Sequence, residues 1–185
     1  MTQPVTEPVT ETGLTGILIP VREAETVVRP RAMLVQPELL PADDGSAAHI
    51  TLLAPFMPVE KIDHGVLSEL TDFFSEVTAF GFELTAVTQF PGGTVYLTPE
   101  PPDVFRRLTL GLHRLFPEFP PYGGEFDDVV PHLSVPMPPD EDAARLRTTL
   151  RRRLPIHAHA TEARLVHITD RMHTLGQFRF GTAAA

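Results

Sequence analysis

The chain has 185 residues, of which 42% are hydrophobic and 21% charged, a composition typical of a globular domain long enough to bury a core. A formal net charge of −9, from 24 acidic and 15 basic side chains, argues against a protein that holds long nucleic acid on a basic surface. Since the sequence shows no cysteine, no apolar run of membrane-span length and no secretory signal, we expect a cytoplasmic protein without disulfides and without a membrane partner.

The first 46 residues are predicted to contain a tail, one strand, a segment without a clear secondary-structure pattern, and a loop. Residues 1–12 are rich in Thr, Pro and Glu, and we expect a flexible tail. A strand is predicted at 14–20. In the segment 21–40, Pro30 argues against one continuous helix. Residues 41–46 are predicted to be a loop.

The next segment, His49-Ile50-Thr51-Leu52, has the alternation of a half-buried strand. Successive side chains of a strand point to opposite faces, so His49 and Thr51 share one face while Ile50 and Leu52 share the other. We therefore expect an apolar back turned to a core and a polar front that carries one imidazole and one hydroxyl.

In the middle of the chain the sequence pattern predicts two helices, a hairpin and a long loop. Apolar residues at helical spacing predict helices over about 61–79 and 102–115. Between them, 82–88 and 95–97 are predicted to form a hairpin around Pro91-Gly92-Gly93. Residues 116–130 contain Phe119 and Tyr122 and no regular period, as in a binding loop or a packed lid.

A second motif, His132-Leu133-Ser134-Val135, repeats the pattern of the first. A helix from about 143 to 154 and a long hairpin over 156–169 and 174–180 are predicted to follow it. Each motif strand thus precedes a helix and a hairpin, which suggests two related halves. The expected architecture is an α+β fold with two lobes, each a mainly antiparallel sheet backed by helices.

At the two motifs, His49-Ile50-Thr51-Leu52 and His132-Leu133-Ser134-Val135, the chain resembles the 2H phosphoesterase superfamily. Members of this superfamily carry two His-x-Thr/Ser motifs and include bacterial proteins named after 2′-5′ RNA ligase and cyclic phosphodiesterases. The residues that flank the motifs, 48–56 and 120–132, are also similar. The resemblance covers about 13–181 and implies a single two-lobed, pseudo-duplicated domain. It also implies a site in a central cleft, with one motif from each lobe.

The paired motifs suggest acid–base chemistry on a phosphodiester. Near neutral pH, His49 and His132 can serve as acid and base, while the hydroxyls of Thr51 and Ser134 donate to phosphoryl oxygens. This chemistry needs neither metal nor cofactor.

The expected function is a metal-independent phosphoesterase, a monomer that acts on 2′,3′-cyclic or 2′-5′-linked nucleotides or short RNA ends. The alternatives are a nucleotide-binding or sensor protein without turnover, and an RNA 2′-5′ ligase. Phe56, Phe119 and Tyr122 are candidates for contact with the substrate. Their rings could equally pack onto the protein.

Two other histidine patterns compete with this site. His167-Ile168-Thr169 is a third His-x-Thr, but it falls outside the positions at which the family places its motifs, and we interpret it as non-catalytic. His157 and His159 share one strand face and could form a metal pair. With no carboxylate or thiol at matching spacing, a surface strand is the favoured interpretation.

Overall fold

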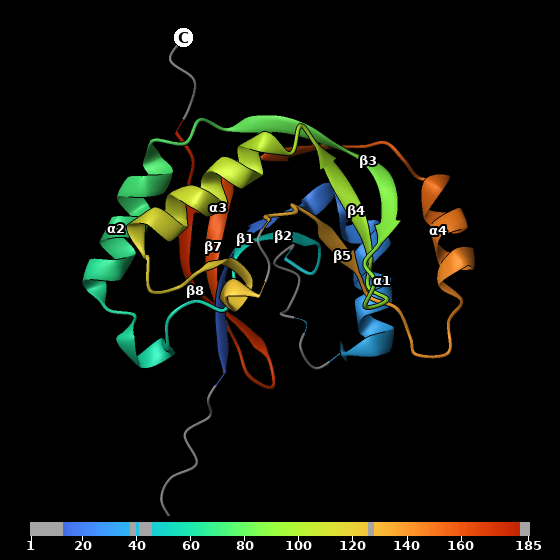
Figure 1. Ribbon diagram of the computed structural model, residues 1–185, viewed down its shortest axis with the longest axis horizontal. Helices are drawn as coiled ribbons and strands as arrows, with labels where there is room; N and C mark the ends of the chain where they lie inside the picture. Colours follow the sequence, from blue (N-terminus) through green and yellow to red (C-terminus); the bar gives the residue numbers. More distant parts are fainter. Residues whose placement is uncertain (1–12, 38–39, 41–45, 126–127, 182–185) are drawn as a thin grey trace, which may run out of the picture.

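The computed structural model describes residues 13–37, 40, 46–125 and 128–181. The predicted tail at 1–12 and nearly all of the predicted loop at 41–46 lie outside the described residues. Within these ranges the chain forms two four-stranded sheets with helices packed on them, so the predicted α+β class is confirmed (Figure 1).

Every pairing between neighbouring strands of the two sheets is antiparallel. The first sheet has the order β2-β1-β7-β8 and consists of β1 (Leu14–Pro20), β2 (His49–Leu53), β7 (Glu162–Ile168) and β8 (Met172–Arg179). The second has the order β5-β4-β3-β6 and consists of β3 (Phe80–Gln89), β4 (Val95–Glu100), β5 (Leu133–Val135) and β6 (Ile156–Ala160). Each motif therefore lies at the edge of a different sheet.

The helices cover these sheets from several sides. They are α1 (Glu25–Val35), α2 (His64–Ser75), α3 (Asp103–Leu115) and α4 (Ala143–Arg151), with single 3-10 turns at Arg22–Ala24 (η1), Val59–Lys61 (η3) and Pro121–Gly124 (η4). In Figure 1, α2 and α3 lie on the side of β7 and β8, while α4 lies beyond β3. No helix among the described residues has the length and apolar character needed to cross a membrane.

The prediction that Pro30 prevents a continuous helix is wrong. The missing N–H of Pro30 removes one hydrogen bond in the middle of α1, and the ring itself is exposed. The helix continues because Val28 and Ala32 are buried in the core on its opposite side. Arg29 also donates to Glu25 across the same turn, at 2.9 Å. Tertiary packing outweighs the local preference here.

The predicted helix over 61–79 is shorter than expected. The carboxylate of Asp63 accepts a hydrogen bond from the Val66 amide at 3.0 Å and caps the first turn of α2, so the helix begins at His64. It ends at Ser75.

The prediction of a single strand over 156–169 is also wrong. The chain changes sheets at Thr161, since β6 pairs with β3 and β7 pairs with β1 and β8. One straight strand could not reach both sheets. As a result the halves exchange their hairpins: the β3–β4 hairpin, which follows the first motif, lies in the sheet of the second, and β7–β8 lies in the sheet of the first.

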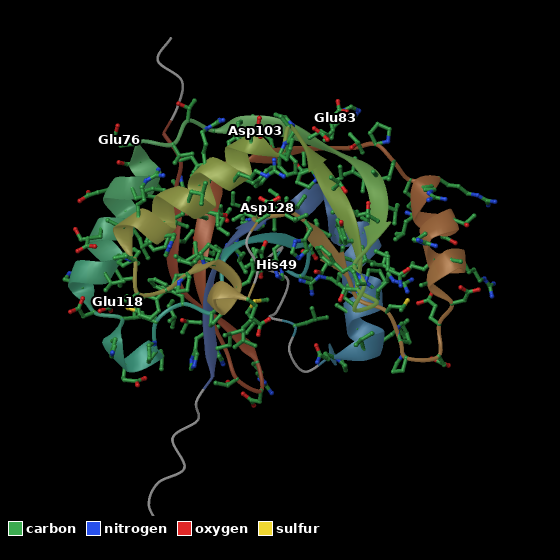
Figure 2. All side chains as sticks on the ribbon, viewed as in Figure 1. His49, Glu76, Glu83, Asp103, Glu118 and Asp128 are labelled. Atoms are coloured by element: carbon green, nitrogen blue, oxygen red, sulfur yellow. The ribbon has the colours of Figure 1, made fainter. Side chains whose placement is uncertain are left out.

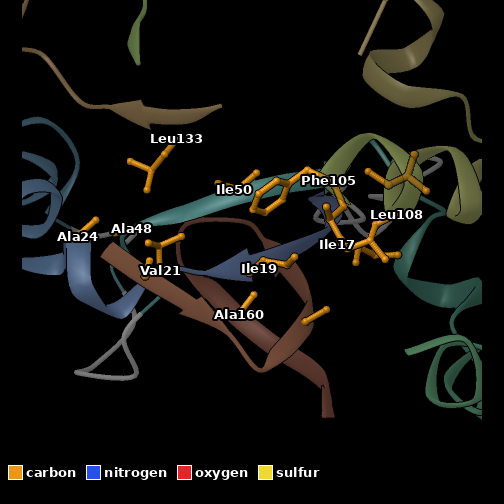
Figure 3. Packing of buried hydrophobic residues seen from close by; sticks show 14 of the residues in the cluster. Ile17, Ile19, Val21, Ala24, Ala48, Ile50, Phe105, Leu108, Leu133 and Ala160 are labelled. Atoms are coloured by element: carbon orange, nitrogen blue, oxygen red, sulfur yellow. The ribbon is translucent and has the colours of Figure 1, made fainter. Parts of the chain in front are cut away.

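One core receives the apolar backs of both motif strands. Figure 3 shows Ile17, Ile19 and Ile50 of the first sheet close to Phe105 and Leu108 of α3. Leu133 of β5 belongs to the same cluster and is drawn on the side of Ile50. The two motifs therefore rest on a shared apolar base.

Candidate active site

The first motif occupies the edge strand β2 with the predicted alternation. Ile50 is 0% and Leu52 2% exposed, whereas His49 and Thr51 are half-buried on the other face. Thr51 pairs with Leu18 and His49 with Pro20 of β1. Figure 2 shows His49 near the middle of the molecule, whereas Glu76 and Glu83 lie at its periphery.

The second motif has the same construction on β5. Leu133 and Val135 are buried and Ser134 is exposed between them. His132 immediately precedes the strand. Ser134 pairs with Tyr96 of β4, which brings an aromatic ring to the front of this sheet.

Both imidazoles are held in the same tautomer. The Nδ1 atom of His49 lies 2.8 Å from the carbonyl oxygen of Ser46, and Nδ1 of His132 lies 2.7 Å from that of Val130. A carbonyl oxygen can only accept, so Nδ1–H must be the donor in each pair. The proton on Nδ1 leaves the lone pair of Nε2 available, and either ring can therefore accept a proton at Nε2.

The two rings lie close enough to influence each other's charge. Burial lowers the pKa of His49; the carbonyls of Ser46 and Ala47 and the carboxylate of Glu25 oppose this, and the charge of His132 lowers the pKa further. Burial also lowers the pKa of His132, against its hydrogen bond to Val130. Strands β2 and β5 are themselves in contact. The fold therefore brings together two histidines that lose their protons readily.

The hydroxyls beside these histidines are available to a ligand. Within the described part of the chain, neither Thr51 nor Ser134 makes a side-chain hydrogen bond. A hydroxyl that makes no hydrogen bond within the protein can donate to an anionic oxygen without breaking an existing contact. Both groups are thus suited to contact a phosphoryl oxygen.

Aromatic rings surround His132. Phe90 lies edge-on to it with ring centroids 4.9 Å apart, Tyr96 is at 5.5 Å and Tyr122 at 6.3 Å. Phe90 also stacks on Tyr96 at 4.1 Å. Our sequence interpretation missed Phe90 and Tyr96. Their position across the predicted hairpin turn was the only local signal, and their proximity to His132 depends on the β4–β5 register.

The three aromatic residues proposed from the sequence lie in different surroundings. Phe56 is 5% exposed and packs edge-on against Phe116 and Phe119, with centroids 5.1 and 5.3 Å away. Tyr122 lies beside His132, and its hydroxyl donates to the Val130 carbonyl at 3.3 Å, the same oxygen that accepts from His132. Burial and the charge of Asp128 raise the pKa of Tyr122, which keeps this donor protonated. Of the three, Tyr122 is the one in contact with a motif.

The third His-x-Thr lies on another face. His167 pairs with Thr15 of β1 and shares its strand face with Leu165. Leu18 pairs with both Arg164 and Thr51, so Thr51 belongs to the opposite face. His167 is therefore separated from the paired motifs by the sheet.

The His157–His159 pair has a simple structural role. His157 lies 3.0 Å from Glu83 on the neighbouring strand; the side chain of His157 is exposed and that of Glu83 is half-buried. No group of three or more His, Cys, Asp or Glu side chains within the described ranges is arranged to hold a metal ion. His157 and His159 are both exposed on β6, the edge strand of its sheet, as expected for a surface strand.

Comparisons with known proteins agree with this architecture. Residues 21–171 match the 2′-5′ RNA ligase superfamily. No curated protein matches the chain significantly. Among solved structures, Escherichia coli LigT in complex with phosphate is 16% identical with a TM-score of 0.56, over 94% of this chain and 100% of LigT. A Thermus thermophilus protein, TT0787, is 18% identical with a TM-score of 0.57, over 92% and 100% of the two chains. A phosphoesterase is 16% identical with a TM-score of 0.55, over 92% and 99%. At these identities the likeness shows a common fold.

Proposed function

Since the chain belongs to the 2′-5′ RNA ligase superfamily, we propose that it is a metal-independent phosphoesterase that acts on 2′,3′-cyclic or 2′-5′-linked nucleotides or on the ends of short RNA. The observation that carries this proposal is the matched pair of imidazoles. His49 and His132 each donate Nδ1–H to a backbone carbonyl, at 2.8 and 2.7 Å, and each retains Nε2 for proton transfer.

The proposed step is an in-line displacement at phosphorus. The neutral imidazole takes a proton from the attacking water through Nε2, while the protonated imidazole gives its proton to the departing sugar oxygen. The bond from water oxygen to phosphorus forms as the bond to the 2′ or 3′ oxygen breaks. The hydroxyls of Thr51 and Ser134 donate to the non-bridging oxygens, on which negative charge increases in the transition state.

A small substrate suits the charge of the protein and its relatives. With a net charge of −9, the surface repels a long polyanion, whereas one phosphate needs only local donors. Solved structures of Escherichia coli LigT include complexes with phosphate, 3′-AMP and ATP, which supports a nucleotide-sized ligand. We therefore propose a nucleotide or a short RNA as substrate and a monomer as the active form.

One observation favours the alternative of nucleotide binding without turnover. Because the pKa values of both histidines are lowered, the free protein carries little of the charged acid at neutral pH. A bound phosphate would restore it by favouring the imidazolium form. Ligation of RNA would be the same displacement with a 5′-hydroxyl in place of water: its oxygen bonds to the phosphorus of a 2′,3′-cyclic end as the bond to the 3′ oxygen breaks, which leaves a 2′-5′ linkage.

The test is a product assay with the purified protein. We expect 2′,3′-cyclic AMP and a 2′-5′-linked dinucleotide to be cleaved in the presence of EDTA, with a single monophosphate regioisomer from the cyclic substrate. Calorimetry on the same samples gives binding independently. Tight binding with no product would favour the sensor, and neither binding nor product would contradict the proposed function.

A further inference from the structure

Helix α1 packs against β5 and makes a polar contact with the backbone beside each motif strand. Neither contact belongs to the paired motifs, and no hydrogen-bonded ladder joins β2 to β5 within the described residues. Both are edge strands held on one side only, by β1 and β4. Something other than sheet pairing must fix their separation.

Glu25 holds the entry to the first motif. One carboxylate oxygen of Glu25 accepts from the Ala48 amide at 2.8 Å, and the other accepts from Nε of Arg29 at 2.9 Å. The amide of Val21, which directly follows β1, donates to the Ala48 carbonyl at 2.8 Å. Ala48 is 0% exposed and directly precedes His49. The amide of the residue before the histidine is thus fixed by α1, and its carbonyl is fixed by the end of β1.

Arg31 holds the exit of the second motif. Its Nε donates to the carbonyl oxygen of Pro136 at 2.8 Å, and its Nη2 forms an ion pair with Glu141. Pro136 follows Ser134 by two residues. The side chains of Arg31 and Glu141 are 19% and 28% exposed, so this is a shielded pair and not a solvated surface contact.

We propose that α1 is a two-point clamp on the site, in which Glu25 positions the strand of His49 and Arg31 positions the strand of His132. The two anchors are six residues apart on one rigid helix, which is roughly 9 Å along its axis. The clamp rests on the proposed function, because it sets the distance between the two proton-transfer groups. Both anchors act through the backbone, so Glu25 and Arg31 are positioning residues.

Glu25 also makes the surroundings of the two histidines unequal. The charged groups that reach His49 are Glu25 on α1, itself paired with Arg29, and His132 beside β5. Among the described residues, α3 and η4, which also pack against β2, add no charged group to these. His132 has aromatic neighbours in place of a carboxylate. Glu25 therefore raises the pKa of His49 against the effect of burial, and it makes no such contribution at His132.

The test uses paired variants of the full chain. Glu25→Gln keeps an oxygen for the Ala48 amide and removes the charge. Arg31→Ala removes both contacts of the second anchor, and Arg31→Lys restores only the charge. Glu141→Gln weakens the same anchor with less change in packing. Arg22→Gln is the matched control, because Arg22 also forms an ion pair with a distant strand residue, Glu162, but reaches neither motif.

The readouts are kcat and KM on 2′,3′-cyclic AMP, and the titration of the His49 ring followed by NMR. We expect Arg31→Ala to lower kcat by about 10- to 10²-fold, as for a misplacement of about 1 Å, with a smaller change in KM. Arg31→Lys and Glu141→Gln should fall between Arg31→Ala and wild type, and Arg22→Gln should match wild type. Glu25→Gln should move the His49 titration to lower pH.

Two results would overturn the clamp: kcat within twofold of wild type in both Arg31→Ala and Glu141→Gln, or an unchanged His49 titration in Glu25→Gln. Failure of the proposed phosphoesterase activity would give a different result from failure of the clamp. In that case the wild-type protein is inactive on every substrate, while the NMR titration still reports whether Glu25 acts on His49.

Discussion

Neighbouring substitutions in β2 should separate stability from chemistry. Ile50 is fully buried between its sheet and α3, so Ile50→Ala removes packing that the core cannot recover fully. Such substitutions cost about 2–5 kcal/mol. For a chain of this length each kcal/mol lowers Tm by about 2–4 °C, so we expect Tm to fall by roughly 4–20 °C. The enzyme that remains folded at low temperature should keep its kcat.

Thr51→Val should do the opposite. Valine keeps the branched shape of this half-buried residue, and the hydroxyl bonds to nothing in the described structure, so we expect stability to change by about 0.5 kcal/mol or less. Loss of one phosphate donor should lower kcat by about 10²-fold. Thermal unfolding and steady-state kinetics on both variants give the comparison. The assignment of faces is refuted if Thr51→Val unfolds early with normal kcat while Ile50→Ala is stable and inactive.

Three further predictions follow from the surroundings of the site. Burial lowers the pKa of both His49 and His132, so the pair carries one proton most often below pH 6.5. We therefore expect kcat/KM to peak below pH 6.5 and to decline as the pH rises. A peak well above pH 6.5 would contradict the assignment of these two histidines as acid and base. His167→Ala should stay within a few-fold of wild-type activity, since its face is opposite that of the site, and a loss as large as that of the motif histidines would overturn this. Tyr122→Ala should weaken nucleotide binding by about 1–3 kcal/mol in calorimetry if its ring stacks on the base. Phe119→Ala, whose ring packs on Phe56, should mainly lower Tm, and the reverse pattern would exchange the two roles.

Local pattern was sufficient for the parts of the site that lie within one strand. The alternation around His49 and around His132 depends only on strand geometry, and the buried Ile50 and Leu133 follow from it. The hairpin and the helix over 102–115 were also predictable, since turn residues and helical spacing are local signals. The α+β class followed from the order of these elements.

Features that depend on long-range pairing could not be predicted in this way. The change of sheet at Thr161 depends on which partners β6 and β7 find, and their sequences read as one strand. The continuity of α1 through Pro30 depends on burial of Val28 by the rest of the fold. The position of Phe90 against His132 likewise requires the register between β4 and β5.

The most direct measurement of the central claim is turnover of 2′,3′-cyclic AMP by wild type, His49→Ala and His132→Ala, each with and without EDTA. We predict that wild type is active in EDTA and that each substitution lowers kcat by about 10² to 10⁴, because each removes one proton-transfer group. Circular dichroism on the same samples confirms that both variants are folded. Full activity in both histidine variants, or loss of wild-type activity in EDTA that zinc or manganese restores, would contradict a metal-independent site built on the paired motifs.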